Sequence, residues 1–152
     1  MGVQIKKVKR FGGRSSTRSP NVYLNFLIKI YRFLAKKNNS KINQVILKRL
    51  LMSRRNQASI SLSGIVRYGM KERKKIIVIV GKVLNDERIS IVPKLSLCTL
   101  KISESAKKRI IEAGGNIFTF DKFAMKFPTG KNSVLLRGSK TCTKKIKRQK
   151  KK

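Results

Sequence analysis

Histidine is absent from this 152-residue sequence, and cysteine and acidic residues are scarce. Without histidine the chain lacks the side chain that titrates near neutral pH, and zinc sites of the Cys/His kind are excluded. Its two cysteines, Cys98 and Cys142, are too few for a disulfide framework and lack the spacing of a metal site. The one adjacent acidic pair, Asp86-Glu87, is expected to lie in a solvated turn. We therefore expect no enzymatic activity, no cofactor and no bound metal.

The six acidic residues are also unevenly placed, since none precedes Glu72. Residues 1–71 contain 17 Lys and Arg, residues 72–136 contain 13 against 6 acidic residues, and residues 137–152 contain 9 with no acidic residue. The formal net charge is +33. A compact body with this charge repels itself unless a dense polyanion lies beside it, and the densest polyanion in a cell is nucleic acid. The composition therefore predicts a protein bound to RNA or DNA.

Signals for export or membrane attachment are missing from the sequence. No apolar run follows Met1, and Lys6 stands where the myristoylation pattern needs Ser or Thr. The longest apolar runs are far shorter than a bilayer span. We expect a cytosolic or nuclear protein with no membrane partner and no small-molecule substrate.

Four segments of different composition follow one another along the chain. Residues 1–18 are rich in Gly, Ser and Arg and are expected to form an extended basic arm. Residues 19–70 are expected to be helical, residues 71–138 to form an α/β core, and residues 139–152 to be a basic C-terminal tail. Because 40% of the residues are hydrophobic, the chain can build a real core. We therefore predict one folded domain with basic tails.

The helical segment begins at Ser19-Pro20, with Ser19 as the cap of a helix over 20–37. Its apolar side chains recur at helical spacing: Tyr23, Leu24, Leu27, Ile30, Tyr31 and Leu34. Phe26 and Phe33 broaden this apolar face, so we expect the helix to be largely buried and its aromatic residues to pack in the core. Tyr68 and Phe11 fall outside this pattern and are better candidates for stacking on bases.

Two further helices are predicted in the same segment. Ser40 caps a helix over 41–53 with Ile42, Val45, Ile46 and Leu50 facing inward and with Lys48 and Arg49 outside. A third helix begins at Ser59 or Ser61 and ends near Tyr68.

Strand and helix patterns alternate after residue 71. The β-branched run 76–80 is typical of a strand buried on both faces. Further strands are predicted over 95–102, 116–120 and 133–136, and helices begin after the caps Ser103 and Asp121. The first of these helices is closed by Gly114-Gly115. The alternation favours an α/β fold with small helices packed on the sheet.

Several stretches follow one another in a recognisable order: Met1-Gly2-Val3-x-Ile5, Tyr31-Arg32-Phe33-Leu34-Ala35, Asn43-Gln44-Val45, Leu47-Lys48-Arg49-Leu50-x-Met52-Ser53-Arg54, Ser61-Leu62-Ser63, Val92-Pro93-Lys94-Leu95, Ser103-x-x-Ala106 with Ile110 and Gly114-Gly115, Phe120-Asp121, and Val134-Leu135-Leu136-x-Gly138. In this order they resemble the eukaryotic large-subunit ribosomal protein eighteen family, which is related to bacterial large-subunit ribosomal protein fifteen. The resemblance covers roughly residues 1 to 138, and the family usually continues into a longer basic C-terminal segment.

The resemblance implies an α/β fold of irregular β-β-α superhelical turns, preceded by N-terminal helices and flanked by basic extended tails. It also implies a structural role in the large subunit of the cytosolic ribosome, with assembly in the nucleus or nucleolus. The partners would be large-subunit ribosomal RNA and neighbouring large-subunit ribosomal proteins.

The candidate RNA-binding residues lie in the arm, at the exit of the second helix, beside Tyr68 and in the tail. They are Lys9, Arg10, Arg14, Arg18, Lys48, Arg49, Arg54, Arg55, Asn56, Arg67, Lys140, Lys144, Lys145, Lys147 and Arg148. Arginines suit phosphates and stacked bases, and Asn suits base edges or 2′-hydroxyls. Each group also has a plainer reading: a solvated arm, an ordinary helix exit, or a nuclear import signal in the C-terminal lysines.

Two other functions remain open at this point. The chain could be an RNA-binding regulator or RNA chaperone that is not part of the ribosome. It could also be an RNA-modifying enzyme, although the sequence shows no cofactor pocket and no Gly-rich loop leading into Lys-Ser or Lys-Thr.

Overall fold

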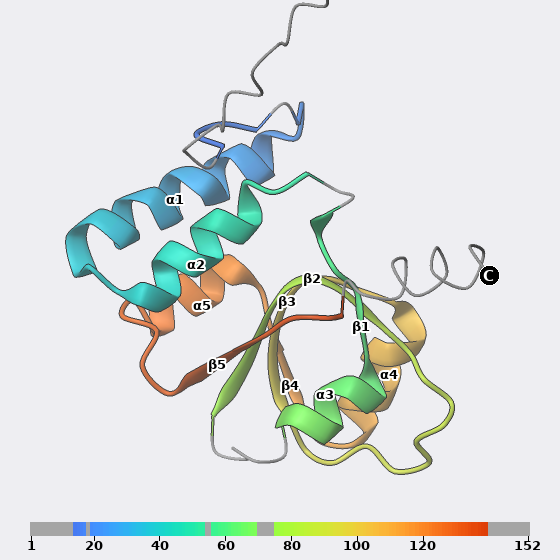
Figure 1. Cartoon of the computed structure of the whole chain (residues 1–152). Helices are drawn as coiled ribbons and strands as arrows, with labels where there is room; N and C mark the ends of the chain where they lie inside the picture. Colours follow the sequence, from blue (N-terminus) through green and yellow to red (C-terminus); the bar gives the residue numbers. More distant parts are fainter. Residues whose placement is uncertain (1–13, 18, 54–55, 70–74, 140–152) are drawn as a thin grey trace, which may run out of the picture.

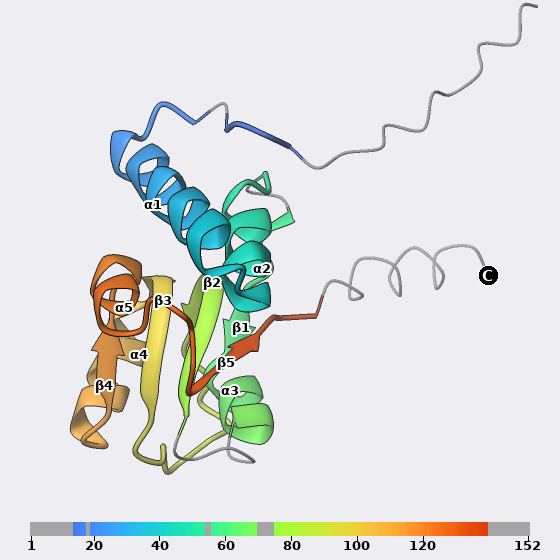
Figure 2. The same cartoon turned by 90° about the vertical axis from the view of Figure 1, so that its left-hand side faces the viewer.

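An open, all-parallel sheet forms the centre of the molecule, with helices on both faces (Figures 1 and 2). The computed structural model describes residues 14–17, 19–53, 56–69 and 75–139. The strands are β1 (Ile60–Ser61), β2 (Ile76–Leu84), β3 (Ser96–Ile102), β4 (Asn116–Phe118) and β5 (Ser133–Leu136). The helices are α1 (Val22–Asn38), α2 (Lys41–Leu50), α3 (Leu62–Gly69), α4 (Glu104–Glu112) and α5 (Phe120–Lys126).

Strand β2 is central to the sheet because it has neighbours along both edges. On one edge it pairs with β3, which in turn pairs with β4. On the other edge β5 pairs with the beginning of β2, from Ile76 to Ile79, and β1 pairs with its end at Val83 and Leu84. The carboxyl end of β5 therefore meets the start of β1, as Figure 1 shows.

The side chains of β2 alternate between two separate cores. Ile76, Val78 and Val80 face the layer that contains α1, α2 and α5. Ile77 and Ile79 face the layer that contains α3 and α4. The predicted strand buried on both faces is thus confirmed, and it extends to Leu84. The predicted strands at β3, β4 and β5 and the α/β class with preceding helices are also confirmed.

Helices α1 and α2 pack on one face of the sheet together with α5. Tyr31 of α1 is fully buried, its ring meets Phe120 edge to face at a centroid distance of 5.9 Å, and its hydroxyl donates to the Phe120 carbonyl oxygen at 3.2 Å. Burial is the main cause of the raised pKa of the Tyr31 hydroxyl. This ring and its hydrogen bond fix α1 against α5.

Amide and hydroxyl side chains hold the α1–α2 turn against the loop that precedes β5. The Nδ2 atoms of Asn38 and Asn43 donate to the Pro128 carbonyl oxygen at 2.9 and 2.8 Å, and the Ser40 hydroxyl donates to the Thr129 carbonyl oxygen at 2.9 Å. Asn43 is only 1% exposed, so its bond matters because a buried amide without a partner is costly. Bonds of this kind join segments almost ninety residues apart.

Several expected helix ends differ from the observed ones. The cap of α1 is Asn21, whose side chain accepts from the Leu24 amide, and not Ser19. The cap of α5 is Thr119, and not Asp121. Helix α2 ends at Leu50 instead of 53, since the chain leaves the helix at Leu51. At α1 and α5 a neighbouring residue takes the capping role, which periodicity alone does not distinguish.

The expected burial of the α1 aromatic side chains is wrong for most of them. Tyr23, Phe26 and Phe33 are 88%, 63% and 61% exposed, and only Tyr31 lies in the core. Val22 is exposed as well, so α1 carries a second apolar stripe on the side opposite Tyr31. In α2, Val45 is also exposed where the inward position was expected, and the polar Asn43 is buried instead. Apolar spacing thus predicted the inward face of both helices, with Leu27, Tyr31, Ile46 and Leu50 in the core, but made that face too wide.

Candidate nucleic-acid interface

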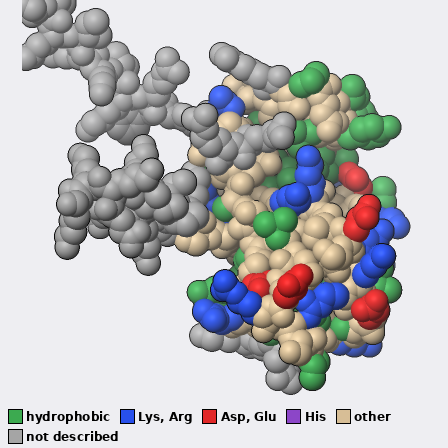
Figure 3. Space-filling model, turned by 90° about the vertical axis from the view of Figure 1, so that its right-hand side faces the viewer, with side chains coloured by type: hydrophobic (Ala, Val, Ile, Leu, Met, Phe, Trp, Pro, Cys, Tyr) green, Lys and Arg blue, Asp and Glu red, His purple; other side chains and the backbone are tan. Residues whose placement is uncertain are grey.

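Exposed cations without nearby carboxylates characterise the described part of the first 69 residues. Lys29, Arg32, Lys36 and Lys37 project from α1, and Lys41 and Lys48 from α2. No Asp or Glu occurs among these residues. By contrast, Figure 3 shows a face on which Asp and Glu lie among Lys and Arg. The helical pair thus presents exposed positive charge and contains no acidic residue of its own.

The described end of the arm lies along α1. The Arg32 guanidinium donates to the Ser15 carbonyl oxygen at 2.5 Å, and the Thr17 hydroxyl donates to Asn25 Oδ1 at 2.8 Å. Asn25 in turn donates to the Ser19 carbonyl oxygen at 3.3 Å. Arg14, a candidate RNA-binding residue, is exposed at the start of this segment. The helix therefore positions the root of the arm through polar bonds.

Arg49 is half-buried and does not lie on the outside of α2 as expected. Its guanidinium donates to the Leu136 carbonyl oxygen of β5 at 2.9 Å. The pKa of Arg49 is lowered from its ordinary value, first by burial and then by the positive charge of Arg137. Arg49 thus links α2 to β5 and brings two guanidiniums near each other.

Of the remaining candidate residues, three are described by the structure and ten lie outside the described residues. Lys48, Asn56 and Arg67 are exposed, with Arg67 beside Tyr68 at the end of α3. The candidates in the arm, the loop after α2 and the tail lie outside the described residues: Lys9, Arg10, Arg18, Arg54, Arg55, Lys140, Lys144, Lys145, Lys147 and Arg148. The structure therefore shows where five of the candidate residues lie. These five do not form a catalytic arrangement.

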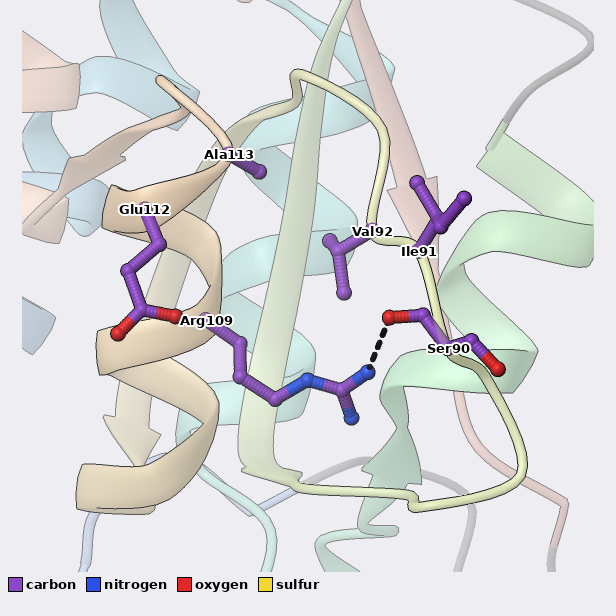
Figure 4. A pocket seen from close by; sticks show the side chains of 6 residues that line it. All are labelled: Ser90, Ile91, Val92, Arg109, Glu112 and Ala113. Carbon is purple, nitrogen blue, oxygen red and sulfur yellow. Dashed lines mark hydrogen bonds between the residues drawn. The ribbon is translucent and has the colours of Figure 1, made fainter.

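A hollow beside α4 is occupied by a structural arginine. Arg109 reaches from α4 to the loop after β2, where its guanidinium donates to Asn85 Oδ1 at 3.0 Å and to the Asp86 carbonyl oxygen at 2.9 Å. It also donates to the carbonyl oxygens of Ile89 and Ser90, the second at 3.3 Å (Figure 4). With its donors used to fix this loop, Arg109 is a structural clamp.

Asp86 in the same loop is also tied into the fold. Its carboxylate accepts from the Ser63 hydroxyl and, at 3.2 Å, from the Arg88 amide. These two hydrogen bonds, the Ser63 bond first, lower the pKa of Asp86. An ionised carboxylate held in this way has no proton to give in acid catalysis.

Other chemistry-bearing groups are equally inert in the described residues. Cys98 is fully buried, and burial raises the pKa of its thiol to about 12, so that it stays protonated. Among the described residues no three His, Cys, Asp or Glu side chains gather as metal ligands. Across the same residues no helix has the length and apolar character to cross a membrane.

Arg137 and the exposed aromatic side chains of α1 were missed by the sequence interpretation. Arg137 follows β5 directly, and its position after a predicted strand was a usable signal. Phe26 and Phe33 are seven residues apart and Val22 is four before Phe26, on the side of the helix opposite Leu27, Tyr31 and Ala35. Two opposite apolar stripes on one helix indicate that the second is open to a partner.

An α/β body that carries a helical pair with exposed cations and no acidic residue has the charge distribution typical of proteins that bind nucleic acid. Residues 2–151 match the family model described as Ribosomal protein 60S L18 and 50S L18e. The chain belongs to this family.

Curated relatives agree with the family model. The chain is 45% identical over 144 residues to the large ribosomal subunit protein eL18 of Diaphorina citri, covering 93% of this chain and 77% of the relative. It is 44% identical to eL18 of Drosophila melanogaster over the same shares. It is also 45% identical to eL18A of Schizosaccharomyces pombe, covering 92% of this chain and 78% of the relative. The family resemblance read from the sequence is thereby confirmed.

Proposed function

We propose that this chain binds and stabilises ribosomal RNA through its acid-free N-terminal half, as a built-in part of the large ribosomal subunit. The role as a structural constituent of that subunit follows from the family and from the names of its relatives. The RNA contacts are what we propose beyond this structural role. The observation that carries them is the absence of any Asp or Glu from residues 1–71 together with the exposed lysines and arginines of α1 and α2.

The chemistry of the contacts follows from the kinds of side chain present. Lysines act as point charges on phosphates, and arginines add paired donors that match phosphate geometry. Such contacts position the protein on RNA without reading its sequence. The rigid sheet beneath α1 and α2 keeps these charges at fixed spacing, which suits a surface that holds crowded RNA segments in place.

We also propose where the chain works and with what. Neighbouring large-subunit proteins contact it alongside the RNA, in the cytosolic ribosome, after assembly in the nucleus or nucleolus. No small-molecule substrate and no cofactor take part.

Salt dependence of binding tests the proposed RNA contacts. The full chain is titrated with a large-subunit rRNA fragment over a series of salt concentrations. Log affinity should fall by about 0.7–0.9 per phosphate contact for each log unit of salt. A flat dependence would contradict the electrostatic mechanism. Sedimentation of a native lysate in low and high salt then tests whether the chain stays with the large subunit at one copy per particle.

A further inference from the structure

A groove lies where the end of β5 crosses the start of β1 and the outer face of α3. It is lined by Ser59, Ile60, Ser61, Gly64, Tyr68, Arg137, Gly138 and Ser139. Its volume is about 320 Å³. Pockets of roughly 300–1,000 Å³ are the ordinary size for bound small ligands and cofactors. The groove is therefore large enough to receive one unstacked nucleotide.

Glycines let the segments that line the groove approach one another closely. On α3, Gly64 lies one turn before Tyr68, and an added Cβ there would lie 3.2 Å from Cγ1 of Ile60. On the β5 side, Gly138 packs so tightly that an added Cβ would lie 1.8 Å from the Ser59 carbonyl oxygen. The groove consequently has an aromatic wall and a floor of backbone.

The aromatic and cationic groups of the groove have no partner among the described residues. Tyr68 is 60% exposed and makes no ring contact there. The exposed Arg137 guanidinium makes no hydrogen bond to the described part of the chain, although its charge acts on Arg49. An anion placed at Arg137 would therefore relieve the repulsion between these two guanidiniums.

One carboxylate, that of Asp86, is linked to the groove through the lining residue Ser61. The Ser61 hydroxyl is hydrogen-bonded to that of Ser63 at 2.8 Å, and Ser63 donates to Asp86. A phosphate is therefore favoured at the Arg137 end and disfavoured near Ser61. Ser59 is exposed in the same lining, and its hydroxyl suits a neutral sugar hydroxyl.

We propose that this groove receives one unstacked nucleotide of single-stranded RNA, with the base on Tyr68, a phosphate on Arg137 and the ribose toward Ser59. The inference rests on the proposed RNA-binding function and assigns one recognition site within it. Base stacking on aromatic side chains is the usual way in which proteins hold unpaired RNA. The site would fix the chain at a bulge or loop, whereas the lysines of α1 and α2 contact phosphates without preference.

Fluorescence quenching tests the stacking step. The full-length chain is titrated with a short single-stranded oligoadenylate that carries 2-aminopurine, whose emission falls when the base stacks on an aromatic ring. Tyr68→Leu should weaken binding about tenfold and remove the quenching, while Tyr68→Phe should retain both. Arg137→Gln should lower the salt slope by about 0.7, the value of one phosphate contact on a single strand.

Tyr23→Leu is the matched control, because Tyr23 is an exposed tyrosine on α1 away from the groove. Equal losses for Tyr23→Leu and Tyr68→Leu would mean unspecific stacking and would overturn the site. If Tyr68→Leu binds and quenches as well as the unmodified chain does, the site is overturned too. A normal salt slope in the same titration would still leave the proposed function intact. Only a flat salt slope of the unmodified chain contradicts that function.

A crosslink in the assembled particle separates RNA from protein as the occupant. Large subunits are purified from cells in which position 68 carries the photoreactive amino acid benzoylphenylalanine. Irradiation should join the chain to ribosomal RNA. A crosslink to a neighbouring protein instead would overturn the assignment of the groove to a nucleotide.

Discussion

The helical pair α1–α2 and the sheet half of the molecule handle charge in opposite ways. The described carboxylates all lie in the sheet half, where Asp86 accepts from Ser63 and Arg109 binds the loop around Asn85. The helical pair has no acidic residue of its own, and although Arg32 and Arg49 donate to carbonyl oxygens, the exposed lysines of α1 and α2 form no ion pair within the described residues. Charge in the sheet half serves the fold, and charge in the helical pair is available to a polyanion.

The two regions nevertheless share one hydrophobic core. Ile46 and Leu50 of α2 belong to the same cluster as Val78 of β2 and Phe123 of α5. The opposite face of β2 has its own cluster, which includes Leu62 and Ile65 of α3. A body that shares a core on one face should lose stability as a unit when either face is disrupted.

Truncating one fully buried isoleucine on each face gives the largest expected effect. Ile46→Ala and Ile65→Ala should each lower the free energy of unfolding by about 2–5 kcal/mol, because each removes buried methyl groups and leaves a cavity. Urea unfolding followed by circular dichroism measures both. Val45→Ala, on the exposed side of α2, is the control and should cost little. A two-step transition for Ile46→Ala alone would show that the helical pair unfolds independently of the sheet.

Removing exposed cations should separate the two regions most clearly in RNA binding. The triple variant Lys36→Gln, Lys41→Gln, Lys48→Gln removes three exposed cations of α1 and α2 and should reduce the salt slope with an rRNA fragment by roughly 2–3. The matched variant Lys101→Gln, Lys107→Gln, Lys122→Gln removes the same charge from exposed positions of the sheet half and should change the slope far less. Equal reductions would mean that the whole surface acts as one diffuse charge, and the comparison between the regions would fail.

The sequence predicted the sheet better than the helices for a physical reason. The run 76–80 is short, β-branched and apolar at every position, which is typical of a strand covered on both sides, as observed. The periodic residues of α1 do meet the core, but the helix is also apolar on its opposite side, and Phe26 and Phe33 of that side were counted with the inward face. Tyr31 was placed correctly in the core, and Phe26 and Phe33 were not. The short β1 was missed because two residues carry no periodic pattern.

The sequence alone predicted the positive charge of the candidate site but not how its residues are arranged in space. The acid-free segment is visible in the sequence alone, but the link from Arg49 to the Leu136 carbonyl oxygen joins positions 87 residues apart. The groove beside Tyr68 likewise depends on β5 crossing β1, which no local pattern specifies. Long-range contacts of this kind are set by the topology of the sheet and appear only with the fold.

A bound arginine in each region provides a smaller, structural test of the comparison. Arg109→Met removes the donors that hold four groups of the loop after β2 and should cost about 2–3 kcal/mol, because carbonyl oxygens lose charged partners. Arg49→Met removes one such bond and should cost about half as much. Thermal and urea unfolding measure both. A larger cost for Arg49→Met would show that its link to β5 matters more than its single bond suggests.

The smallest expected effect is on stability at acid pH, through the hydrogen-bonded carboxylate of Asp86. The Ser63 hydroxyl lowers the pKa of Asp86 in the folded chain below its unfolded value of about 3.9. Its contribution to stability is therefore present above that unfolded pKa and is lost as the pH falls through the lower folded pKa. Ser63→Ala should flatten the stability profile between about pH 5 and pH 2, measured by urea unfolding at each pH. Glu87→Gln, which removes the adjacent exposed carboxylate, should leave this limb of the profile unchanged. If Glu87→Gln flattens it as much as Ser63→Ala does, the general charge of the loop and not the hydroxyl of Ser63 determines the acid limb. In that case the carboxylates of the sheet half would act through their overall charge, as we propose for the exposed lysines of α1 and α2.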